Sequence, residues 1–212
     1  MKSEYDLEQP MSINSRKVST TSDPYALIQQ FREELPIFYY KKTITDMLLN
    51  NNIVLITGET GSGKSTQLPQ YVYDSVEINK QVLEKNIENG NSPIDNNLNI
   101  VITQPRRVAA ISMAKRIAFE RGTAFINDYI SYTIRFDDRC TDKTRLRYMT
   151  DGILVRECID DPMLNKYHIV ILDEAHERQI STDILFSLCK EAVRKRNGGL
   201  KLIVTSATMD TN

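Results

Sequence analysis

The sequence predicts an α/β protein with a mainly parallel sheet sandwiched by helices. Short apolar runs rich in β-branched residues recur along the chain, helical segments separate them, and a glycine-rich loop joins the first run to a helix. Unbroken β-branched runs are typical of strands buried on both faces. Alternation of such strands with helices favours a parallel sheet.

The composition is that of an ordinary globular protein, with 41% hydrophobic and 26% charged residues among 212. This length predicts one domain. We expect no transmembrane helix and no secretory signal, since the chain lacks a long apolar run and its beginning is polar. The scattered cysteines at 140, 158 and 189 predict neither a disulfide framework nor a zinc site, which fits a reducing intracellular compartment. Because the net charge is only −1, nucleic-acid binding would depend on local residues.

The N-terminal part of the chain predicts a tail followed by two helices. Residues 1–23 are polar and rich in Ser and Thr, which is typical of a flexible tail. Asp23 can cap a helix and Pro24 suits its first turn, so a helix is expected from there. A second helix is expected from Ile37 to Asn50.

Apolar runs after this point are predicted as strands. They cover residues 53–57, 100–102, 129–134, 146–149, 169–172 and 202–204. Helical periodicity marks residues 107–121 and 180–196. The Asn-rich segment 77–99 shows no sustained apolar period, so it is predicted to be a solvated surface insertion between the first helix of the sheet and the second strand.

A phosphate-binding loop is predicted directly after the first strand. The loop matches G-x-x-x-x-G-K-[ST] with Gly58, Glu59, Thr60, Gly61, Ser62, Gly63, Lys64 and Ser65. Its glycines allow a tight turn that aims backbone N–H groups at phosphate oxygens, and the following helix N-terminus favours negative charge. Lys64 would reach the β- and γ-phosphates, and the Ser65 hydroxyl would bind Mg²⁺.

A carboxylate pair, Asp173 and Glu174, follows the apolar run 169–172. Ligands of open parallel sheets bind at the carboxyl ends of the strands, so this pair is expected beside the phosphate loop. Asp173 could hold Mg²⁺ through water, and Glu174 could accept a proton from the attacking water. The two acids and Lys64 are the predicted catalytic residues.

Several motifs together give the chain a resemblance to a known family. Asp173-Glu174-Ala175-His176 spells DEAH, and the other motifs occur in the family's order: 58–66, 103–110 (TQPRRVAA), 132–138 (YTIRFDD), 150–157 (TDGILVRE) and Ser206-Ala207-Thr208. Residues 31–212 resemble the DEAH-box RNA helicases of superfamily 2. The resemblance implies that residues 24–212 form the first RecA-like ATPase domain and that ATP and Mg²⁺ are the cofactors.

The resemblance also implies roles for single residues. Thr66 would join the phosphate loop in holding phosphates, and Arg116 would stack on the nucleotide base. Because stacking discriminates bases poorly, other nucleoside triphosphates should be tolerated. His176, Ser206 and Thr208 would couple hydrolysis to strand movement.

Arginines after the second strand are the candidate RNA contacts. From the residues alone, Arg106 and Arg107 could be a solvated helix start or could bind phosphates of single-stranded RNA, and the resemblance favours the second interpretation. Thr150, Arg135 and Phe136 are expected to contribute. Arginine–phosphate contacts do not read bases, so binding should tolerate sequence and weaken with salt.

The resemblance predicts an ATP-dependent RNA helicase or remodelling enzyme that acts on single-stranded or structured RNA. No membrane is expected among its partners. The second RecA-like domain lies outside the 212 residues, so the chain alone is expected to be weak or inactive. An activating protein partner and a nuclear or nucleolar location follow from the family alone. Two alternatives stay open: a nucleotide- or RNA-binding module without turnover, and a P-loop ATPase acting on another polymer.

Overall fold

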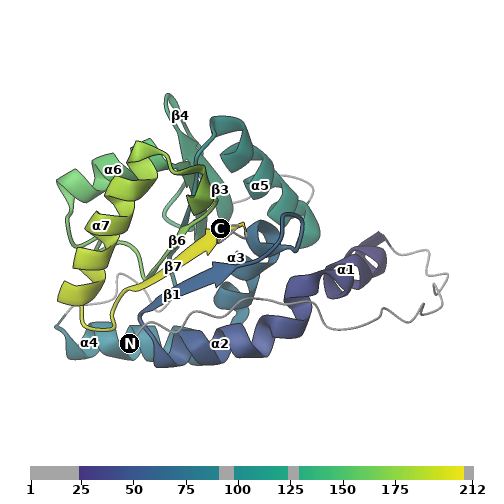
Figure 1. The fold of residues 1–212 in the computed structure, drawn as a ribbon, viewed down its shortest axis with the longest axis horizontal. Helices are drawn as coiled ribbons and strands as arrows, with labels where there is room; N and C mark the ends of the chain where they lie inside the picture. Colours follow the sequence, from purple (N-terminus) through teal and green to yellow (C-terminus); the bar gives the residue numbers. More distant parts are fainter. Residues whose placement is uncertain (1–23, 91–97, 124–128, 208–212) are drawn as a thin grey trace, which may run out of the picture.

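The computed structural model describes residues 24–90, 98–123 and 129–207. The predicted tail 1–23 and Thr208 therefore lie outside the described residues. The fold consists of one sheet with helices on both faces (Figure 1). Among the described residues, no helix combines the length and apolar composition needed to cross a bilayer.

The sheet has seven strands in the order β1-β7-β6-β2-β5-β3-β4. Every neighbouring pair is parallel except β3 and β4, which are antiparallel. The strands are β1 (Ile53–Thr57), β2 (Ile100–Gln104), β3 (Ile130–Ile134), β4 (Asp137–Asp138), β5 (Leu146–Thr150), β6 (Ile169–Leu172) and β7 (Lys201–Ser206). The predicted fold class is confirmed, and the short β4 is the one strand in this part of the chain that the apolar runs did not indicate.

Two apolar clusters fill the space between the sheet and its helices. Side chains of α2, α3, α4 and α5 pack on one face, and those of α6 and α7 pack on the other. The helices are α1 (Pro24–Glu34), α2 (Lys41–Asn50), α3 (Lys64–Asp74), α4 (Val76–Glu88), α5 (Arg107–Glu120), α6 (Asp151–Asp160) and α7 (Ile180–Lys195), with short 3₁₀ turns η1 (Pro36–Tyr40) and η2 (Ala175–Glu177). Helix α1 stands away from the sheet, at the right of Figure 1.

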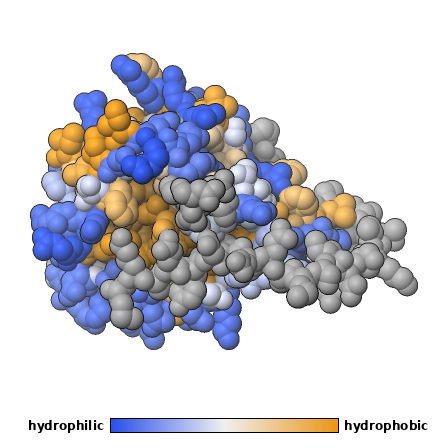
Figure 2. All heavy atoms as spheres, viewed as in Figure 1, coloured by the Kyte–Doolittle hydropathy of each residue, from blue (hydrophilic) through white to orange (hydrophobic). Residues whose placement is uncertain are grey.

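Apolar side chains also gather on the outer surface of α6 and α7. Ile159 of α6 and Ile180 and Ile184 of α7 are exposed. Figure 2 shows hydrophobic side chains at the upper left of the molecule, in the region of these two helices. Contiguous apolar patches on a protein surface often mark contact surfaces.

The first apolar run was wrongly expected to be buried on both faces. Strand β1 lies at one end of the sheet and pairs with β7 alone among the described strands. Val54 and Ile56 are buried, whereas Ile53 and Leu55 on the opposite face are 38% and 36% exposed. Among the described residues, helix α7 packs mainly on β6 and β7, which fits the partial exposure of Ile53 and Leu55 at the end of the sheet.

The interpretation of 77–99 as a solvated loop was wrong for its first half. Residues up to Glu88 form α4, which begins with the Ser75 hydroxyl accepting a hydrogen bond from the N–H of Ile78 (3.4 Å). Ile78, Val82 and Asn86 follow at four-residue spacing and are all buried. The third of these is polar, which hid the apolar period, and its side-chain amide donates to the Gly199 carbonyl (2.8 Å).

The carboxyl ends of the parallel strands meet at one edge of the sheet, as the predicted topology requires. Following the strand order, the phosphate loop leaves β1, Ser206 ends β7 and Asp173 follows β6. Arg106 then follows β2, and Thr150 ends β5. The sheet therefore sets the predicted nucleotide residues and the predicted RNA residues side by side along a single edge.

Candidate functional site

The phosphate loop is closed by its own lysine. Lys64 is the first residue of α3 and is only 7% exposed. Its ammonium donates hydrogen bonds to the carbonyls of Gly58 (2.6 Å) and Glu59 (2.8 Å) and to the Ser62 hydroxyl (3.2 Å). Burial lowers the pKa of Lys64, and the carboxylates of Glu174 and Asp173 oppose that shift. The Lys64 ammonium therefore provides a positive charge inside the loop that can attract a polyanion.

Gly63 is required by the shape of the loop. Its φ is +95°, and a Cβ there would lie 2.9 Å from Cγ2 of Ile37 and 3.1 Å from Cδ1 of Leu35. The N–H of Ile37 also donates to the Ser62 carbonyl (3.1 Å). The residues that precede α2 therefore support the phosphate loop, both by packing against it and by a backbone hydrogen bond.

Asp173 is buried and held in one orientation. Its Oδ2 accepts a hydrogen bond from the side chain of Gln104 at 2.5 Å, and its Oδ1 accepts from the hydroxyl of Thr205. Oδ1 also accepts from the N–H of Glu174 (3.0 Å). Three donors from β2, β7 and its own loop fix the carboxylate, which is 2% exposed. Oδ1 accepts two of these hydrogen bonds and Oδ2 one, so Oδ2 keeps a lone pair that can accept a further hydrogen bond, for example from water.

Glu174 lies between the phosphate loop and η2. It has a left-handed backbone (φ 57°), and its Oε1 accepts from the Ser65 hydroxyl at 3.5 Å. Burial is the main cause that raises the pKa of Glu174, Asp173 adds to it, and His176 and Lys64 oppose it. A carboxylate with a raised pKa is a better proton acceptor near neutral pH than an ordinary glutamate.

His176 connects the acidic pair to the end of β7. Its Nδ1 accepts a hydrogen bond from the N–H of Ala207 (3.1 Å), so the proton of the neutral ring is on Nε2. That nitrogen is 3.4 Å from Oε2 of Glu174. The Ser206 carbonyl in turn accepts from the N–H of Gly58 (3.3 Å). The phosphate loop, the DEAH segment and the residues at the end of β7 are therefore joined by these contacts.

The predicted RNA residues form a more exposed group. Arg106 is paired with Glu177 of η2, at 3.2 Å between Nη2 and Oε1. Arg107 donates through Nη2 to the carbonyl of Arg135 (3.2 Å), which lies in the turn between β3 and β4. The Arg135 guanidinium covers the Phe136 ring at 4.9 Å, and that ring is 92% exposed.

The other predicted positions lie around these two groups. Thr150 is partly exposed at the end of β5, in register with Gln104 of β2. The exposed Glu59 and Thr60 form the outer part of the phosphate loop. Thr66 is on α3, and Arg116 is on α5, where Glu120 accepts a hydrogen bond from its Nε (2.7 Å).

Sequence reasoning gave no role to three residues that orient the site. Gln104 and Thr205 hold Asp173, and Glu120 holds Arg116. Gln104 and Thr205 are on the two strands that flank β6, so a predicted strand order could have indicated them. Glu120 follows Arg116 by four residues on one helix, and this spacing could have indicated the pair.

Comparison with known proteins gives close relatives over most of the chain. It is 46% identical over 183 residues to the pre-mRNA-splicing factor ATP-dependent RNA helicase prp22 of Schizosaccharomyces pombe. It is 44% identical over 194 residues to the probable ATP-dependent RNA helicase DHX35 of Homo sapiens. These matches cover 86% and 90% of the chain, including the DEAH residues.

This chain belongs to the DEAH-box RNA helicase family. A sequence model described as the Schlafen group 3, DNA/RNA helicase domain also matches residues 51–196. That match begins just before β1 and ends just after α7. The chain spans 14% of the length of the fission yeast relative and 25% of the human one. The family assignment therefore concerns the part that contains the DEAH motif.

Proposed function

We propose that this chain binds and hydrolyses ATP as the first RecA-like domain, residues 24–212, of an ATP-dependent RNA helicase. The observation that carries the proposal is the meeting of Lys64, Ser65 and Glu174 at the carboxyl edge of the sheet. The Ser65 hydroxyl lies 3.5 Å from Glu174, although the two residues are 109 positions apart. The names of the relatives support the same activity.

In this function the phosphate loop holds the triphosphate. Backbone N–H groups and Thr66 would bind phosphate oxygens, and Lys64 would leave the loop carbonyls to bind the β- and γ-phosphates. Glu174 would accept a proton from the attacking water, which its raised pKa favours. His176 and Ser206 would couple hydrolysis of the γ-phosphate to a movement at the end of β7.

The donor set near the loop fits Mg²⁺. Ser65 offers a hydroxyl oxygen and Asp173 a fixed carboxylate, and oxygen atoms are the ligands that this ion prefers. With Ser65 as the direct protein ligand and Asp173 acting through water, the remaining positions would be left to water and phosphate oxygens, which is the usual arrangement for this ion. Bound there, Mg²⁺ would neutralise charge on the β- and γ-phosphates.

Single-stranded RNA is the proposed polymer ligand. Arg106, Arg107 and Arg135 would contact its phosphates, Thr150 would add a hydrogen bond, and the exposed Phe136 ring offers a stacking surface. We infer loose choice among nucleoside triphosphates, since Arg116 would recognise the base by stacking. The splicing name of the fission yeast relative supports a nuclear location.

A second RecA-like domain, outside the 212 residues, would complete the site. An arginine supplied across such a cleft is worth about 10³ to 10⁵ in rate in related phosphoryl-transfer enzymes, so slow turnover is expected from this chain alone. A protein that brings the domains together would act as an activator.

DNA is the second candidate polymer. The description of the matching domain family as DNA/RNA helicase favours it, because arginine–phosphate contacts alone do not separate the two nucleic acids. Equal affinity for single-stranded DNA and RNA of one sequence would support the DNA candidate, whereas tighter RNA binding supports the proposal.

Two substitutions test the proposed function in the 212-residue chain. Lys64→Ala should abolish binding of Mg-ATP, measured with a non-hydrolysable analogue by calorimetry. Arg106→Glu should weaken RNA binding more than nucleotide binding, and a lower salt dependence should accompany the loss. Unchanged nucleotide affinity in Lys64→Ala would overturn the nucleotide site, and the reverse order for Arg106→Glu would overturn the RNA assignment.

A further inference from the structure

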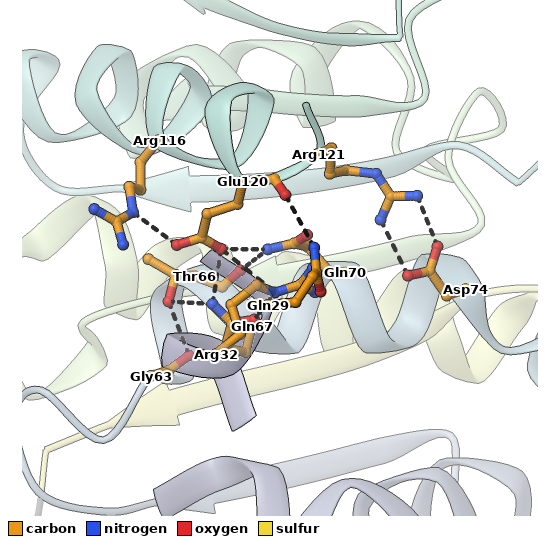
Figure 3. A network of polar contacts seen from close by, with 10 residues as sticks. All are labelled: Gln29, Arg32, Gly63, Thr66, Gln67, Gln70, Asp74, Arg116, Glu120 and Arg121. Carbon is orange, nitrogen blue, oxygen red and sulfur yellow. Dashed lines mark hydrogen bonds and ion pairs between the residues drawn. The ribbon is translucent and has the colours of Figure 1, made fainter. Parts of the chain in front are cut away.

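A buried carboxylate joins three helices beside the nucleotide site. Glu120, the last residue of α5, is 1% exposed. Its Oε2 accepts hydrogen bonds from the side chains of Gln67 and Gln70 on α3, both at 2.8 Å. Its Oε1 accepts from Nε of Arg116 at 2.7 Å (Figure 3). A charge this deeply buried is tolerated because several donors surround it.

The cluster continues into the phosphate loop. Gln67 also donates to the hydroxyl of Thr66 (3.1 Å), and Thr66 donates to the carbonyl of Gly63 (3.4 Å). Figure 3 shows these side chains leading from Arg116 through Glu120 to the beginning of α3. Arg116, proposed to contact the base, is therefore tied by hydrogen bonds to the loop proposed to hold the phosphates.

Helix α1 contributes to the same cluster from outside the sheet. Arg32 donates to Oε1 of Gln67 at 2.8 Å and lies 3.8 Å from Oε2 of Glu120. One residue earlier, the Phe31 ring lies under the Arg116 guanidinium, 5.8 Å from its centroid to Cζ. Phe31 is 51% exposed and Arg116 is 43% exposed, so both reach solvent.

These contacts restrain Arg116 on two sides. Glu120 holds Nε, which limits rotation of the guanidinium plane, and the guanidinium carbon Cζ lies over the face of the Phe31 ring. Among the described residues, Arg116 donates hydrogen bonds through Nε alone, so Nη1 and Nη2 are not engaged in the cluster. The Arg116 side chain held in this way is 43% exposed and so can meet a planar ligand, and a group ordered before binding loses less entropy on binding.

We propose that Phe31 and Glu120 are positioning residues that hold Arg116 flat against the nucleobase, which makes α1 a part of the nucleotide site. The inference rests on the proposed function, because it takes Arg116 as the base contact. It adds a stacking order in which Arg116 lies between Phe31 and the base. It also adds to the nucleotide site a helix that precedes the phosphate loop by about thirty residues in the sequence.

Two probes separate base recognition from phosphate recognition. The dissociation constants of a non-hydrolysable ATP analogue and of inorganic tripolyphosphate, both with Mg²⁺, are measured on the 212-residue chain. Phe31→Leu keeps an apolar side chain but removes the ring. It should weaken binding of the ATP analogue by roughly three- to tenfold, the size of a cation–π contact, and leave tripolyphosphate binding unchanged. Phe31→Trp keeps an aromatic ring and should bind the analogue about as tightly as the unsubstituted chain does.

Matched variants complete the experiment. Leu27→Ala removes another exposed apolar side chain of α1 and should change neither dissociation constant. Glu120→Gln removes the charge that holds Arg116 and should show the same preferential loss of the ATP analogue as Phe31→Leu. Because Phe31 is half exposed, its variants are expected to fold even if the Glu120 variant does not.

The outcomes distinguish this inference from the proposed function. If Phe31→Leu weakens both probes equally, or neither, the positioning role is overturned while the nucleotide site stands. If the unsubstituted chain binds neither probe, or Lys64→Ala binds both as tightly, the proposed function itself fails. A loss confined to the ATP analogue and rescued by Phe31→Trp supports the inference.

Discussion

Along one edge of the sheet, the residues beyond β1, β7 and β6 are held differently from those beyond β2, β5 and β3. In the first group Lys64 is 7% exposed and Asp173 is 2% exposed, and both make several hydrogen bonds. In the second group the Arg106 side chain is 73% exposed and Phe136 is 92% exposed. The edge therefore has a buried half with the proposed nucleotide residues, here called the nucleotide half, and an exposed half with the proposed RNA residues, called the RNA half.

The difference reflects the two proposed ligands. Chemistry at a γ-phosphate needs charges that are desolvated and already oriented, because such groups cost no reorganisation during the reaction. A nucleic-acid strand instead offers many phosphates at the surface, and each contact with an exposed arginine is weak and screened by salt. Single substitutions should accordingly have large effects in the nucleotide half and small effects in the RNA half.

The largest effect is expected at Glu174. Replacing the proposed proton acceptor in Glu174→Gln should lower the rate of ATP hydrolysis by about 10² to 10⁴. Burial raises the pKa of Glu174, and the carboxylate is the active form. The rate of the unsubstituted chain should therefore fall with acidification at a higher pH than an ordinary glutamate would cause. Single-turnover hydrolysis across a pH series measures both effects, and equal rates for the two proteins would remove Glu174 as the base.

A smaller but still large effect is expected at Gly63. Gly63→Ala places a left-handed alanine 2.9 Å from Ile37, which should add about 1–3 kcal/mol of overpacking to a backbone strain of about 1–2 kcal/mol. Gly61→Ala is the matched control, since Gly61 has a φ of +82° but no atom within 4 Å of the added Cβ. Denaturant unfolding should show the greater loss for Gly63→Ala, and equal losses would contradict the packing argument.

An intermediate effect is expected where Asp173 is oriented. Thr205→Val removes a hydroxyl that donates to the buried carboxylate and should cost about 1.5–3 kcal/mol of unfolding free energy. Thr205→Ser keeps the hydroxyl and should lose less. Chemical denaturation of the three proteins tests this order, and a stable valine variant would show that Gln104 and the Glu174 N–H suffice to hold Asp173.

The smallest effect is expected in the exposed half. Glu177 pairs with Arg106 and would compete with an RNA phosphate for it. Glu177→Gln should therefore tighten binding of single-stranded RNA, but only by about two- to fivefold, because an exposed ion pair contributes at most about 1 kcal/mol. Fluorescence anisotropy at low salt measures the change. A gain much larger than this would mean that the two halves of the edge are not as different as their exposure indicates.

The sequence predicted where the phosphate loop and the acidic pair lie relative to the strands better than it predicted their surroundings. The phosphate loop and the acidic pair are local patterns, and their places after β1 and β6 follow from the apolar runs. The edge position of β1 was not predicted, because burial on one face or two depends on which strands and helices become neighbours. Helix α4 was missed because its third buried position is Asn86, a polar residue whose partners Gly199 and Arg196 are more than a hundred residues away.

By itself, the sequence determined the α/β class, the order of strands and helices along the chain and the residue types of the site, because these depend on local periodicity and on short motifs. The tertiary structure alone decided that Gln104 and Thr205 hold Asp173, that Glu120 joins α3 to Arg116, and that α1 lies against the same cluster. Apart from the Arg116–Glu120 pair, which is four residues apart on α5, these contacts join residues that are far apart in the sequence. Their geometry follows from how strands and helices pack, which no local pattern specifies.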